Sequence, residues 1–350
     1  MRIKFYATYY VLSIFLFMGC REIKKEDPSE PRVSGTSFPI LEEGNIEAFN
    51  DRLWSVIPKD ANIEILADGH DWTEGPLWLA DHEMLLYSDI PRNAVYAWKE
   101  GEGASVYLQP SGYLGEDFKG AEPGANGLIQ DRDGALVLCQ HGERQVARMN
   151  GGIRDPKPEF TVLAGQFNGK RFNSPNDAVY MSNGDLYFTD PPYGLPKQMN
   201  DPGKELPFQG VYRLDQSGKV TLLTDQLSRP NGIAFSPDEE RLYVANSDPE
   251  EAIWTVFTVE EDGTLGEGSV LYDATELVAD HKGLPDGLKV DASGNVFGTG
   301  PGGVFIFAPS GEALGRINTG QATSNCAFNE DKSVLYITAD RYVLRVKLTR

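Results

Sequence analysis

The hydrophobic and polar positions along the chain follow one pattern six times. Each occurrence has a polar residue, a short apolar strand, a turn with Asp, Asn or Gly, and a second apolar strand. The six segments are TEGPLWLADHEMLLYSDI, GANGLIQDRDGALVLCQ, SPNDAVYMSNGDLYFTD, RPNGIAFSPDEERLYVAN, LPDGLKVDASGNVFGTG and TSNCAFNEDKSVLYITAD. Their polar residues lie 39 to 55 positions apart, which leaves room for two further strands in each repeat. Repeats of this length with four strands each predict an all-β fold, a six-bladed β-propeller.

The two ends of the repeated region predict how the ring closes. The segment ANIEILADG near the start could pair with the last blade around RYVLRVKL. No long segment has helical periodicity, which argues against a doubly wound α/β fold. The glycine pattern GTGPGG at 298–303 is followed by the strand-like VFIFAP, so it is interpreted as a hairpin rather than a dinucleotide site.

The polar residue of each repeat carries a side-chain oxygen. In a propeller the innermost strands line the central channel, so six residues in register should converge near one end of it. Carboxylates and amide carbonyls are the ligands that calcium prefers, whereas zinc and copper favour Cys and His. The pattern therefore predicts a metal site on the central axis, formed from Glu74, Asn126, Asn176, Asn231, Asp286 and Asn325.

Charge and cysteine content narrow the function classes. The formal net charge of -20 argues against a nucleic-acid partner, because the phosphates would be repelled. It is compatible with cation binding and also with a solvated acidic surface. Beyond residue 20 the cysteines are Cys139 and Cys326, each inside an apolar run; they could pair, but buried free thiols are favoured.

The N-terminal residues have the features of an export signal. Residues 1–20, MRIKFYATYYVLSIFLFMGC, combine a basic start with an apolar run too short to span a bilayer comfortably. Their end resembles a bacterial lipobox, with Phe17 where Leu is usual, so Cys20 is predicted to be acylated; the alternative is an ordinary signal peptide. Residues 21–40 are predicted to be a flexible tether and 41–350 the propeller domain. We expect an exported protein, lipid-anchored in the bacterial cell envelope, periplasmic or surface-facing, with no other membrane attachment.

Four segments carry a resemblance to a known family. They are EGPLW, SPNDAVYMSNGDLYFTDP, RPNGIAFSPDEERLYVAN and LPDGLKVDASGNVF. Over about residues 60 to 345 the chain resembles the SMP-30/gluconolactonase/luciferin-regenerating-enzyme family, six-bladed propellers that hydrolyse lactones with a divalent metal on the axis. The resemblance implies a gluconolactonase-like hydrolase of class EC 3.1.1 acting on a small-molecule lactone. The implied cofactor is Ca²⁺ or another divalent cation such as Mg²⁺, Mn²⁺ or Zn²⁺, and we expect a monomer or a weak dimer.

The resemblance also assigns roles to individual residues. It implies that Glu74, Asn231 and Asp286 are metal ligands, and that Asn176 is a ligand in some members and a substrate contact in others. On this hypothesis the metal stabilises charge on the lactone carbonyl, while Asp286 takes a proton from the attacking water and passes one to the departing ring oxygen.

Further residues are candidate substrate contacts. Asn126 is favoured as a polar contact on the substrate side. His141, in CQHGERQV, is predicted to face the mouth, with a surface position as the alternative. Tyr193, in DPPYG, could stack on a sugar ring or pack over a blade. One departure from the family matters: its animal branch has an arginine that contacts sugar hydroxyls where this chain has Ser174, so specificity for sugar lactones does not carry over.

Two other functions compete with the lactonase. A non-catalytic propeller could hold a structural calcium and bind a carbohydrate or a protein at its mouth, since propellers host both roles. A paraoxonase-like esterase would depend on histidines at the mouth, for which His141 is the candidate. The axial carboxylates favour the enzyme, because buried charges are costly unless a cation is held between them.

Overall fold

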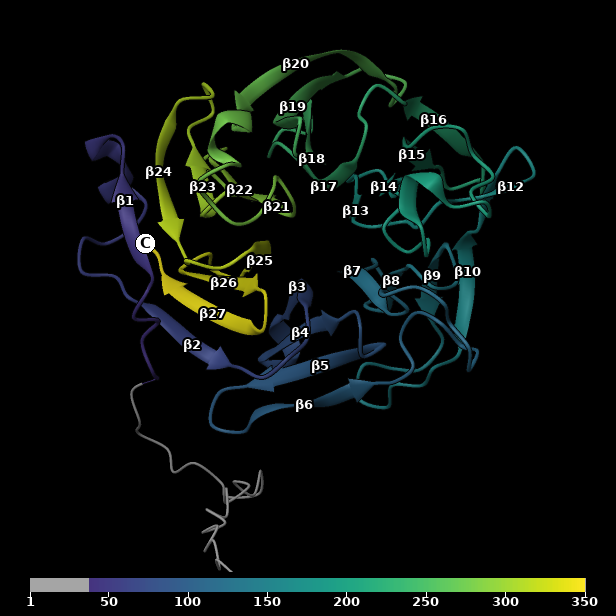
Figure 1. The fold of residues 1–350 in the computed structure, drawn as a ribbon, viewed down its shortest axis with the longest axis horizontal. Helices are drawn as coiled ribbons and strands as arrows, with labels where there is room; N and C mark the ends of the chain where they lie inside the picture. The colour runs from purple at the N-terminus through teal and green to yellow at the C-terminus, as the bar shows by residue number, and fades with distance from the viewer. Residues whose placement is uncertain (1–37, 350) are drawn as a thin grey trace, which may run out of the picture.

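The structure, a computed structural model, describes residues 38–349. Six antiparallel sheets stand around a central opening (Figure 1), which confirms the predicted six-bladed β-propeller. The predicted signal peptide with Cys20 lies outside the described residues, as does the predicted tether up to residue 37. Within the described part of the chain, no helix is long and apolar enough to span a membrane.

The blades follow one another along the chain. Blade 1 contains β3 (Thr73–Leu79), β4 (Met84–Asp89), β5 (Ala94–Lys99) and β6 (Gly103–Leu108). Blade 2 contains β7 (Ala125–Gln130), β8 (Leu136–Gln140), β9 (Gln145–Met149) and β10 (Phe160–Ala164). Blade 3 contains β13 (Ala178–Tyr180), β14 (Leu186–Asp190), β15 (Gly210–Leu214) and β16 (Val220–Thr224), and a small hairpin, β11 (Gln166–Phe167) with β12 (Lys170–Arg171), precedes it.

The other three blades complete the ring. Blade 4 contains β17 (Pro230–Phe235), β18 (Arg241–Asp248), β19 (Glu251–Val259) and β20 (Leu265–Asp273). Blade 5 contains β21 (Leu288–Val290), β22 (Val296–Gly300), β23 (Gly303–Phe307) and β24 (Ala313–Asn318). Blade 6 contains β25 (Thr323–Phe328), β26 (Val334–Ala339) and β27 (Tyr342–Lys347). Short 3₁₀ turns are η1 (Asp51–Ser55), η2 (Ala80–His82), η3 (Gln198–Asn200) and η4 (Thr275–Leu277).

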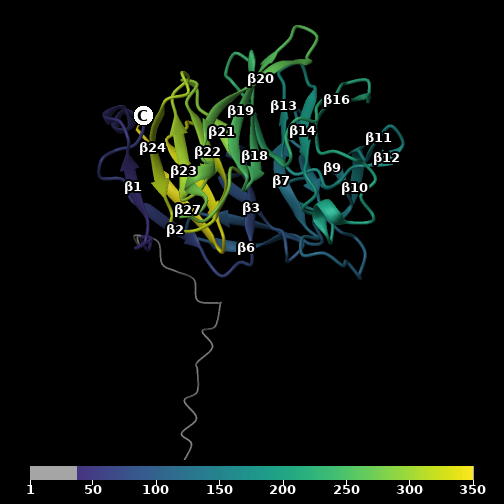
Figure 2. The same ribbon diagram turned by 45° about the horizontal axis from the view of Figure 1, so that its top comes forward.

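The N-terminal segment closes the ring as the sequence predicts. Strand β2 (Ile63–Ala67) pairs antiparallel with β27, with Ile63 opposite Val346, and so becomes the outer strand of blade 6. Strand β1 (Asn45–Ala48) pairs with β24 and gives blade 5 a fifth strand. The segment therefore crosses the outside of two blades, as Figure 2 shows at the side where the chain ends.

The packed part of the chain begins before residue 41, where the sequence analysis placed the domain boundary. The Phe38 ring lies 6.0 Å from that of Trp98, and Ile40 forms a β-bridge with Glu64. Apolar contacts and main-chain pairing therefore fix residues 38–40 against the propeller, although they were predicted to belong to the tether.

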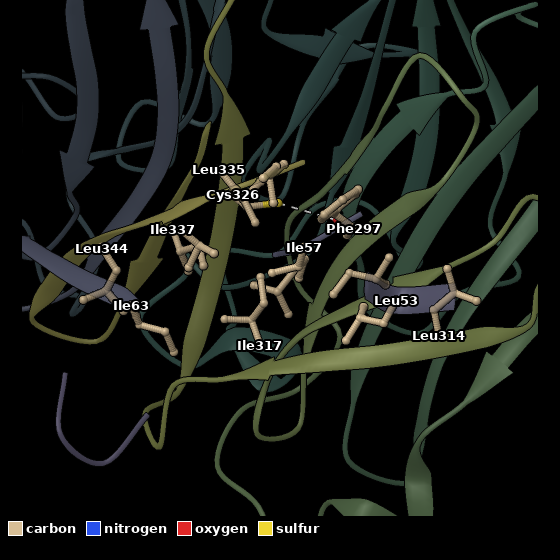
Figure 3. Close-up of a cluster of buried hydrophobic side chains, with 14 of the residues drawn as sticks. Leu53, Ile57, Ile63, Phe297, Leu314, Ile317, Cys326, Leu335, Ile337 and Leu344 are labelled. Atoms are coloured by element: carbon tan, nitrogen blue, oxygen red, sulfur yellow. Dashed lines mark hydrogen bonds between the residues drawn. The ribbon is translucent and has the colours of Figure 1, made fainter. Parts of the chain in front are cut away.

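The hydrophobic core is divided into six layers, one between each pair of adjacent blades. Figure 3 shows the layer between blades 5 and 6, with side chains from Ile317 to Leu344 and with Leu53 from η1. Because both faces of an inner strand pack on a neighbouring blade, all six residues of β4 are buried, whereas most of the edge strand β6 is exposed. Cys139 and Cys326 are free, buried thiols, as predicted.

Candidate active site

One cavity of about 420 Å³ lies among the inner strands and brings together the polar residues of the repeats. Asn325 is just outside it, and its Nδ2 donates a hydrogen bond of 3.1 Å to Glu74 Oε2. The six residues that the repeats place in register therefore converge, as expected. Those that line the cavity are Glu74, Asn126, Asn176, Asn231 and Asp286.

Irregular strand pairing turns these residues toward the axis. The register of β3 shifts between Glu74 and Leu77, and the shifts in β7 and β17 span Asn126 and Asn231. A bulge takes a residue out of the regular alternation of a strand and re-aims its side chain. The local irregularity is therefore what presents a polar side chain at the start of an otherwise apolar strand.

Close contact between blades explains the glycine that follows four of the six polar residues. Gly75 has φ +51°, and a Cβ there would lie 2.1 Å from the carbonyl oxygen of Asn126 on the next blade. A Cβ at Gly287 would lie 1.9 Å from the Asn325 side chain. Glycine is needed because the next blade's polar residue occupies the space of a side chain.

Buried hydroxyls hold the same backbone from the second strands. Ser88 Oγ donates to the carbonyl of Asn126 over 2.8 Å, and Thr189 Oγ1 donates to the carbonyl of Asn231 over 2.7 Å. In both cases the hydroxyl is on one blade and its acceptor on the next. These bonds fix the polar residues relative to one another around the ring. The sequence analysis did not find them, although a small residue recurs at this place in YSD, FTD and ITA.

Four side-chain oxygens around the cavity are shielded from solvent and have no hydrogen-bond partner among the described residues. They belong to three different amides and one carboxyl group, on four blades. A buried acceptor without a donor costs about 1–3 kcal/mol, so such atoms are rare unless another group satisfies them. These oxygens are Oδ1 of Asn126, Asn176, Asn231 and Asp286.

The two axial carboxyl groups disfavour each other's ionisation. Burial raises the pKa of Glu74 to about 7. Hydrogen bonds from the Gly75 amide and Asn325 lower this pKa, whereas the nearby Asp177 carboxyl group raises it. Burial also raises the pKa of Asp286 well above its ordinary value, and Glu74 adds to that effect. Two carboxylates that share a cavity favour a bound cation, which would allow both to ionise.

The residues around the cavity fit a hard divalent cation. The two carboxyl groups and the amide oxygens of Asn176 and Asn231 form a ligand set typical of calcium, with its flexible geometry. No cluster of three or more His, Cys, Asp or Glu residues able to hold a metal occurs within residues 38–349. Glu74, Asn176, Asn231 and Asp286 are the residues that could hold the ion.

Comparisons with known proteins agree with this geometry. Residues 72–341 match the sequence profile of the SMP-30/gluconolactonase/LRE-like region. The chain belongs to this family. It is 39% identical over 310 residues to a gluconolactonase of Zymomonas mobilis, covering 87% of this chain and 86% of that protein. It is 25% identical to a pentonolactonase of Haloferax volcanii, covering 76% and 80% of the two chains.

Solved structures give the same assignment. A gluconolactonase of Xanthomonas campestris superposes with a TM-score of 0.76 at 31% identity, over 91% of this chain and 99% of that one. Regucalcin of Agrobacterium tumefaciens, a calcium-binding protein, superposes with a TM-score of 0.63 at 18% identity, which supports the shared fold alone. The family assignment made from the four sequence segments is thus confirmed.

This family member has a second polar layer beside the cavity. Asp177, which follows Asn176 where four other blades have glycine, is 3% exposed. Its Oδ2 lies 3.8 Å from Lys289 Nζ, and Lys289 also donates to the carbonyl of Leu288 over 3.0 Å. Burial raises the pKa of Asp177, while Lys289 lowers it. The lysine therefore supplies a fixed positive charge to this layer.

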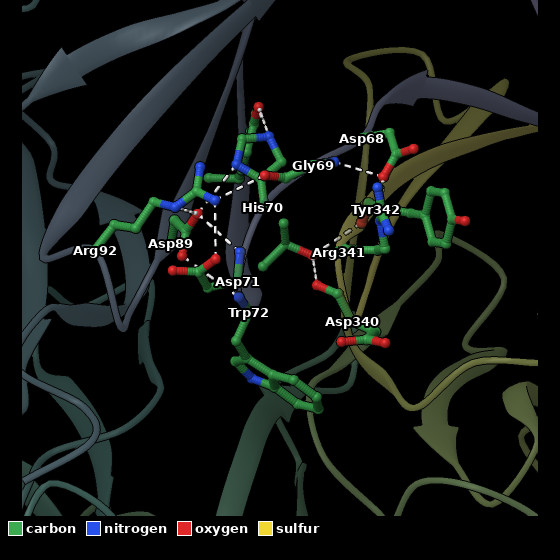
Figure 4. Close-up of polar contacts among 12 residues, drawn as sticks. Asp68, Gly69, His70, Asp71, Trp72, Asp89, Arg92, Asp340, Arg341 and Tyr342 are labelled. Atoms are coloured by element: carbon green, nitrogen blue, oxygen red, sulfur yellow. Dashed lines mark hydrogen bonds and ion pairs between the residues drawn. The ribbon is translucent and has the colours of Figure 1, made fainter. Parts of the chain in front are cut away.

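The last residue of β4 holds the segment that leads to Glu74. Asp89 Oδ2 accepts hydrogen bonds from the Asp71 amide and lies 3.1 Å from His70 Nδ1, and Arg92 lies 3.3 Å away (Figure 4). His70 Nε2 is in turn 2.9 Å from the Tyr87 hydroxyl. Every polar atom of this carboxylate has partners, so the cluster is structural.

In blades 3 and 4 a side chain at the same place likewise holds the loop that leads to the cavity residue. Asp190 accepts 2.8 Å hydrogen bonds from the backbone amides of Asn173 and Ser174, just before Asn176. Asn246 Oδ1 accepts one from the Arg229 amide, just before Asn231. Asp89 and Asp190 thus fix the loops that carry the cavity residues.

Tyr193 lines the cavity, and its hydroxyl donates to the Ser247 carbonyl over 3.2 Å. Burial raises the pKa of this phenol above its usual range. The loop is held by Ser174, whose Oγ donates to Pro191 O over 2.6 Å and accepts from the Gly194 amide over 2.9 Å. The Ser174 hydroxyl is thus occupied by the backbone and does not replace the arginine of the animal branch.

His141 is not on the cavity wall, contrary to expectation. It is fully buried, and its Nδ1 lies 2.9 Å from Oε2 of Glu122, which does line the cavity. The loop between β6 and β7 brings Glu122 in front of it. His141 therefore adjoins the cavity only through Glu122.

Sequence reasoning missed other polar side chains on the wall. Glu122, Arg229 and His281 all line the cavity. None lies in the repeated apolar pattern, because each belongs to a loop or to a segment before a strand. The signal for Arg229 was its place two residues before Asn231, but a single arginine in a turn carries no distinguishing pattern.

Proposed function

We propose that this protein is a divalent-metal-dependent lactonase that opens a sugar lactone or a related cyclic ester. Lactone hydrolysis, in class EC 3.1.1, rests on the family and on the gluconolactonases at 39% and 31% identity. Metal dependence rests on one observation: four shielded oxygens without hydrogen-bond donors, among the described residues, surround a single cavity that also holds Glu74.

The axial residues hold the cation, and Ca²⁺ suits them best. When bound, the cation polarises the lactone carbonyl. Glu74 and Asp286 supply two negative charges, and Asn176 and Asn231 supply neutral oxygens. Asn126, on the same wall, contributes a polar contact to the substrate. Tyr193 offers an aromatic surface to the lactone ring.

Asp286 moves the proton. As water attacks, its oxygen bonds to the carbonyl carbon, and the Asp286 carboxylate accepts the proton that the water loses. The bond between that carbon and the ring oxygen then breaks, and Asp286 returns the proton to the ring oxygen. The product is an open-chain hydroxy acid. Burial raises the pKa of the Asp286 carboxyl group in the metal-free protein, and a bound cation would let the group ionise and act as the base.

The test is lactone hydrolysis by protein that lacks residues 1–20, stripped of metal with a chelator and then supplied with Ca²⁺, Mg²⁺, Mn²⁺ or Zn²⁺. We expect turnover of glucono-1,5-lactone that disappears with the metal and returns with it. No turnover of any lactone, with metal still raising the melting temperature, would favour the alternative, a carbohydrate- or protein-binding propeller with a structural calcium.

We further propose that Cys20 is acylated and that the enzyme acts outside the cytoplasmic membrane as a monomer or weak dimer. The proposal rests on the lipobox-like Phe17-Met18-Gly19-Cys20. Cys20→Ser is expected to release the protein from the membrane fraction. Mass spectrometry of the mature N-terminus should find the lipid, and an unmodified Cys20 would contradict the proposal.

A further inference from the structure

Two opposite charges face the cavity without meeting each other. Glu122 comes from the loop before β7 and Arg229 from the segment before β17, on either side of β13 (Figure 1). No ion pair joins them within the described part of the chain. A carboxylate and a guanidinium that share a small cavity attract each other strongly unless each is held in place or binds a ligand.

The backbone of Arg229 is held in place by hydrogen bonds. Its backbone amide donates to Asn246 Oδ1 over 2.8 Å, and its carbonyl accepts from the Ser247 amide over 2.9 Å. The guanidinium itself has no hydrogen bond or ion pair to any residue in 38–349. Each of the other arginines that are at least partly buried there has such a partner, as Arg316 does with Glu47.

Glu122 is held from behind. His141 Nδ1 lies 2.9 Å from Glu122 Oε2, and the His141 side chain is fully shielded from solvent. The Glu122 side chain is 27% exposed, so its other carboxylate oxygen is available on the cavity side. The pair therefore offers a planar donor group from one wall and an acceptor from another.

The overall charge of the wall selects the ligand class. Among the carboxyl groups and arginines that line the cavity, a divalent cation would balance Glu74 and Asp286, and Arg229 would balance Glu122. A neutral ligand rich in hydroxyl groups satisfies both, because a guanidinium donates in a fork to neighbouring oxygens while a carboxylate accepts from O–H groups. The cavity volume of about 420 Å³ is in the range of small-molecule sites.

We propose that Glu122 and Arg229 form a clamp for the hydroxyl groups of a neutral, polyhydroxylated lactone, with His141 as a positioning residue. The inference deepens the proposed lactonase function and rests on it. The clamp holds the substituents of the ring while the axial residues act on the ester.

Binding of non-hydrolysable lactams tests the clamp separately from catalysis. The probes are glucono-1,5-lactam, which carries the hydroxyls, and 2-piperidone, which has the same ring without them. Calorimetry on the metal-loaded protein should show Kd for the gluconolactam at least tenfold higher in Arg229→Gln and Glu122→Gln. Kd for 2-piperidone should change less than threefold. Arg132→Gln, an exposed arginine in the turn after β7, is the matched control and should change neither.

Kinetics give the second readout. The ratio of kcat/KM for glucono-1,5-lactone to that for δ-valerolactone should fall about 10- to 100-fold in Arg229→Gln, and Arg229→Lys should not restore it. His141→Ala should lower the ratio, and His141→Asn, which keeps a donor near Nδ1, should recover part of it. An unchanged ratio, or an equal loss on both lactones, overturns the clamp. If wild-type protein binds gluconolactam through the clamp but opens no lactone, the proposed function is refuted while the clamp stands.

Discussion

Asp190 and Asp286 are carboxyl groups in shielded sites, and burial raises the pKa of both, to about 7 in Asp190. They differ in their hydrogen bonds. Both oxygens of Asp190 accept backbone amides at 2.8 Å, whereas Asp286 Oδ1 has no partner among the described residues. A raised pKa therefore does not distinguish a carboxyl group that holds a loop from one that takes part in the reaction. The unsatisfied oxygen does, because it is the group that a ligand must complete.

The largest expected effect is on turnover. Asp286→Asn should lower kcat/KM by about 10³-fold or more, since it removes the group that moves the proton. The melting temperature of the metal-free variant should stay the same or rise, because a buried carboxyl group whose ionisation the fold disfavours is removed. Lactone assays and thermal unfolding of the same samples check both parts. An active Asp286→Asn variant would remove this residue from the mechanism.

Substitution of Asp190 should have the opposite pattern of effects: a loss of stability rather than of turnover. Asp190→Ala leaves the buried amides of Asn173 and Ser174 without an acceptor, which costs about 1–3 kcal/mol for each. We expect the free energy of unfolding in urea to fall by about 2–5 kcal/mol, with loss of activity only in proportion to the folded fraction. Asp190→Asn keeps one acceptor and should lose less. Full stability in Asp190→Ala would show that the hydrogen bonds to the Asp190 carboxylate are not needed to hold the loop.

The axial pair should make stability depend on pH. Burial raises the pKa of Glu74 to about 7 from an ordinary value of 4.5. The metal-free folded state then keeps a proton that the unfolded state has lost, so stability falls as pH rises from about 4.5 to 7, by about 3 kcal/mol. Saturating Ca²⁺ should flatten this slope, because both carboxylates ionise around it.

Unfolding of chelated protein at several pH values measures the slope, with Glu74→Gln as the variant that should lose the part contributed by Glu74, while the raised pKa of Asp286 leaves the remainder. A slope that is the same with and without Ca²⁺ would contradict the cation site. Glu74→Gln should also be more stable than wild type at pH 8 without metal.

A smaller effect is expected in the second layer. Lys289→Met removes the positive charge 3.8 Å from the buried Asp177 carboxylate and should lower stability by about 1–3 kcal/mol. Adding Asp177→Asn to the Lys289→Met variant should restore much of the lost stability, since no buried charge is then left without a partner. A double-mutant cycle measures the coupling, and a coupling near zero would mean that the pair does not interact.

The ring of polar residues was predictable from the sequence because it recurs. Six oxygens in register, each before an apolar strand, indicate both the propeller and the convergence of Asn126 with Asn231 on one axis. The closure of β2 on β27 followed from the same count of strands. The resemblance of four segments to the family then supplied the predicted roles of Glu74 and Asp286.

The mouth was not predictable in the same way. Glu122, Arg229 and His281 occur once each, outside the repeats, and only tertiary contacts bring them to the wall. His141 was predicted there because its loop follows the second strand of blade 2, but the loop before β7 covers it with Glu122. Side chains placed by one loop against another leave no periodic signal in the sequence.

The central claim is that the unsatisfied oxygens form a cation site, and calcium binding tests it most directly. Calorimetry on chelator-treated protein should find one tight Ca²⁺ site per chain, weakened at least 100-fold in Glu74→Gln. Glu122→Gln, on the same wall but held by His141, should change the affinity less than about fivefold. Wild-type protein that binds no divalent cation, or equal losses in the two variants, would contradict the account.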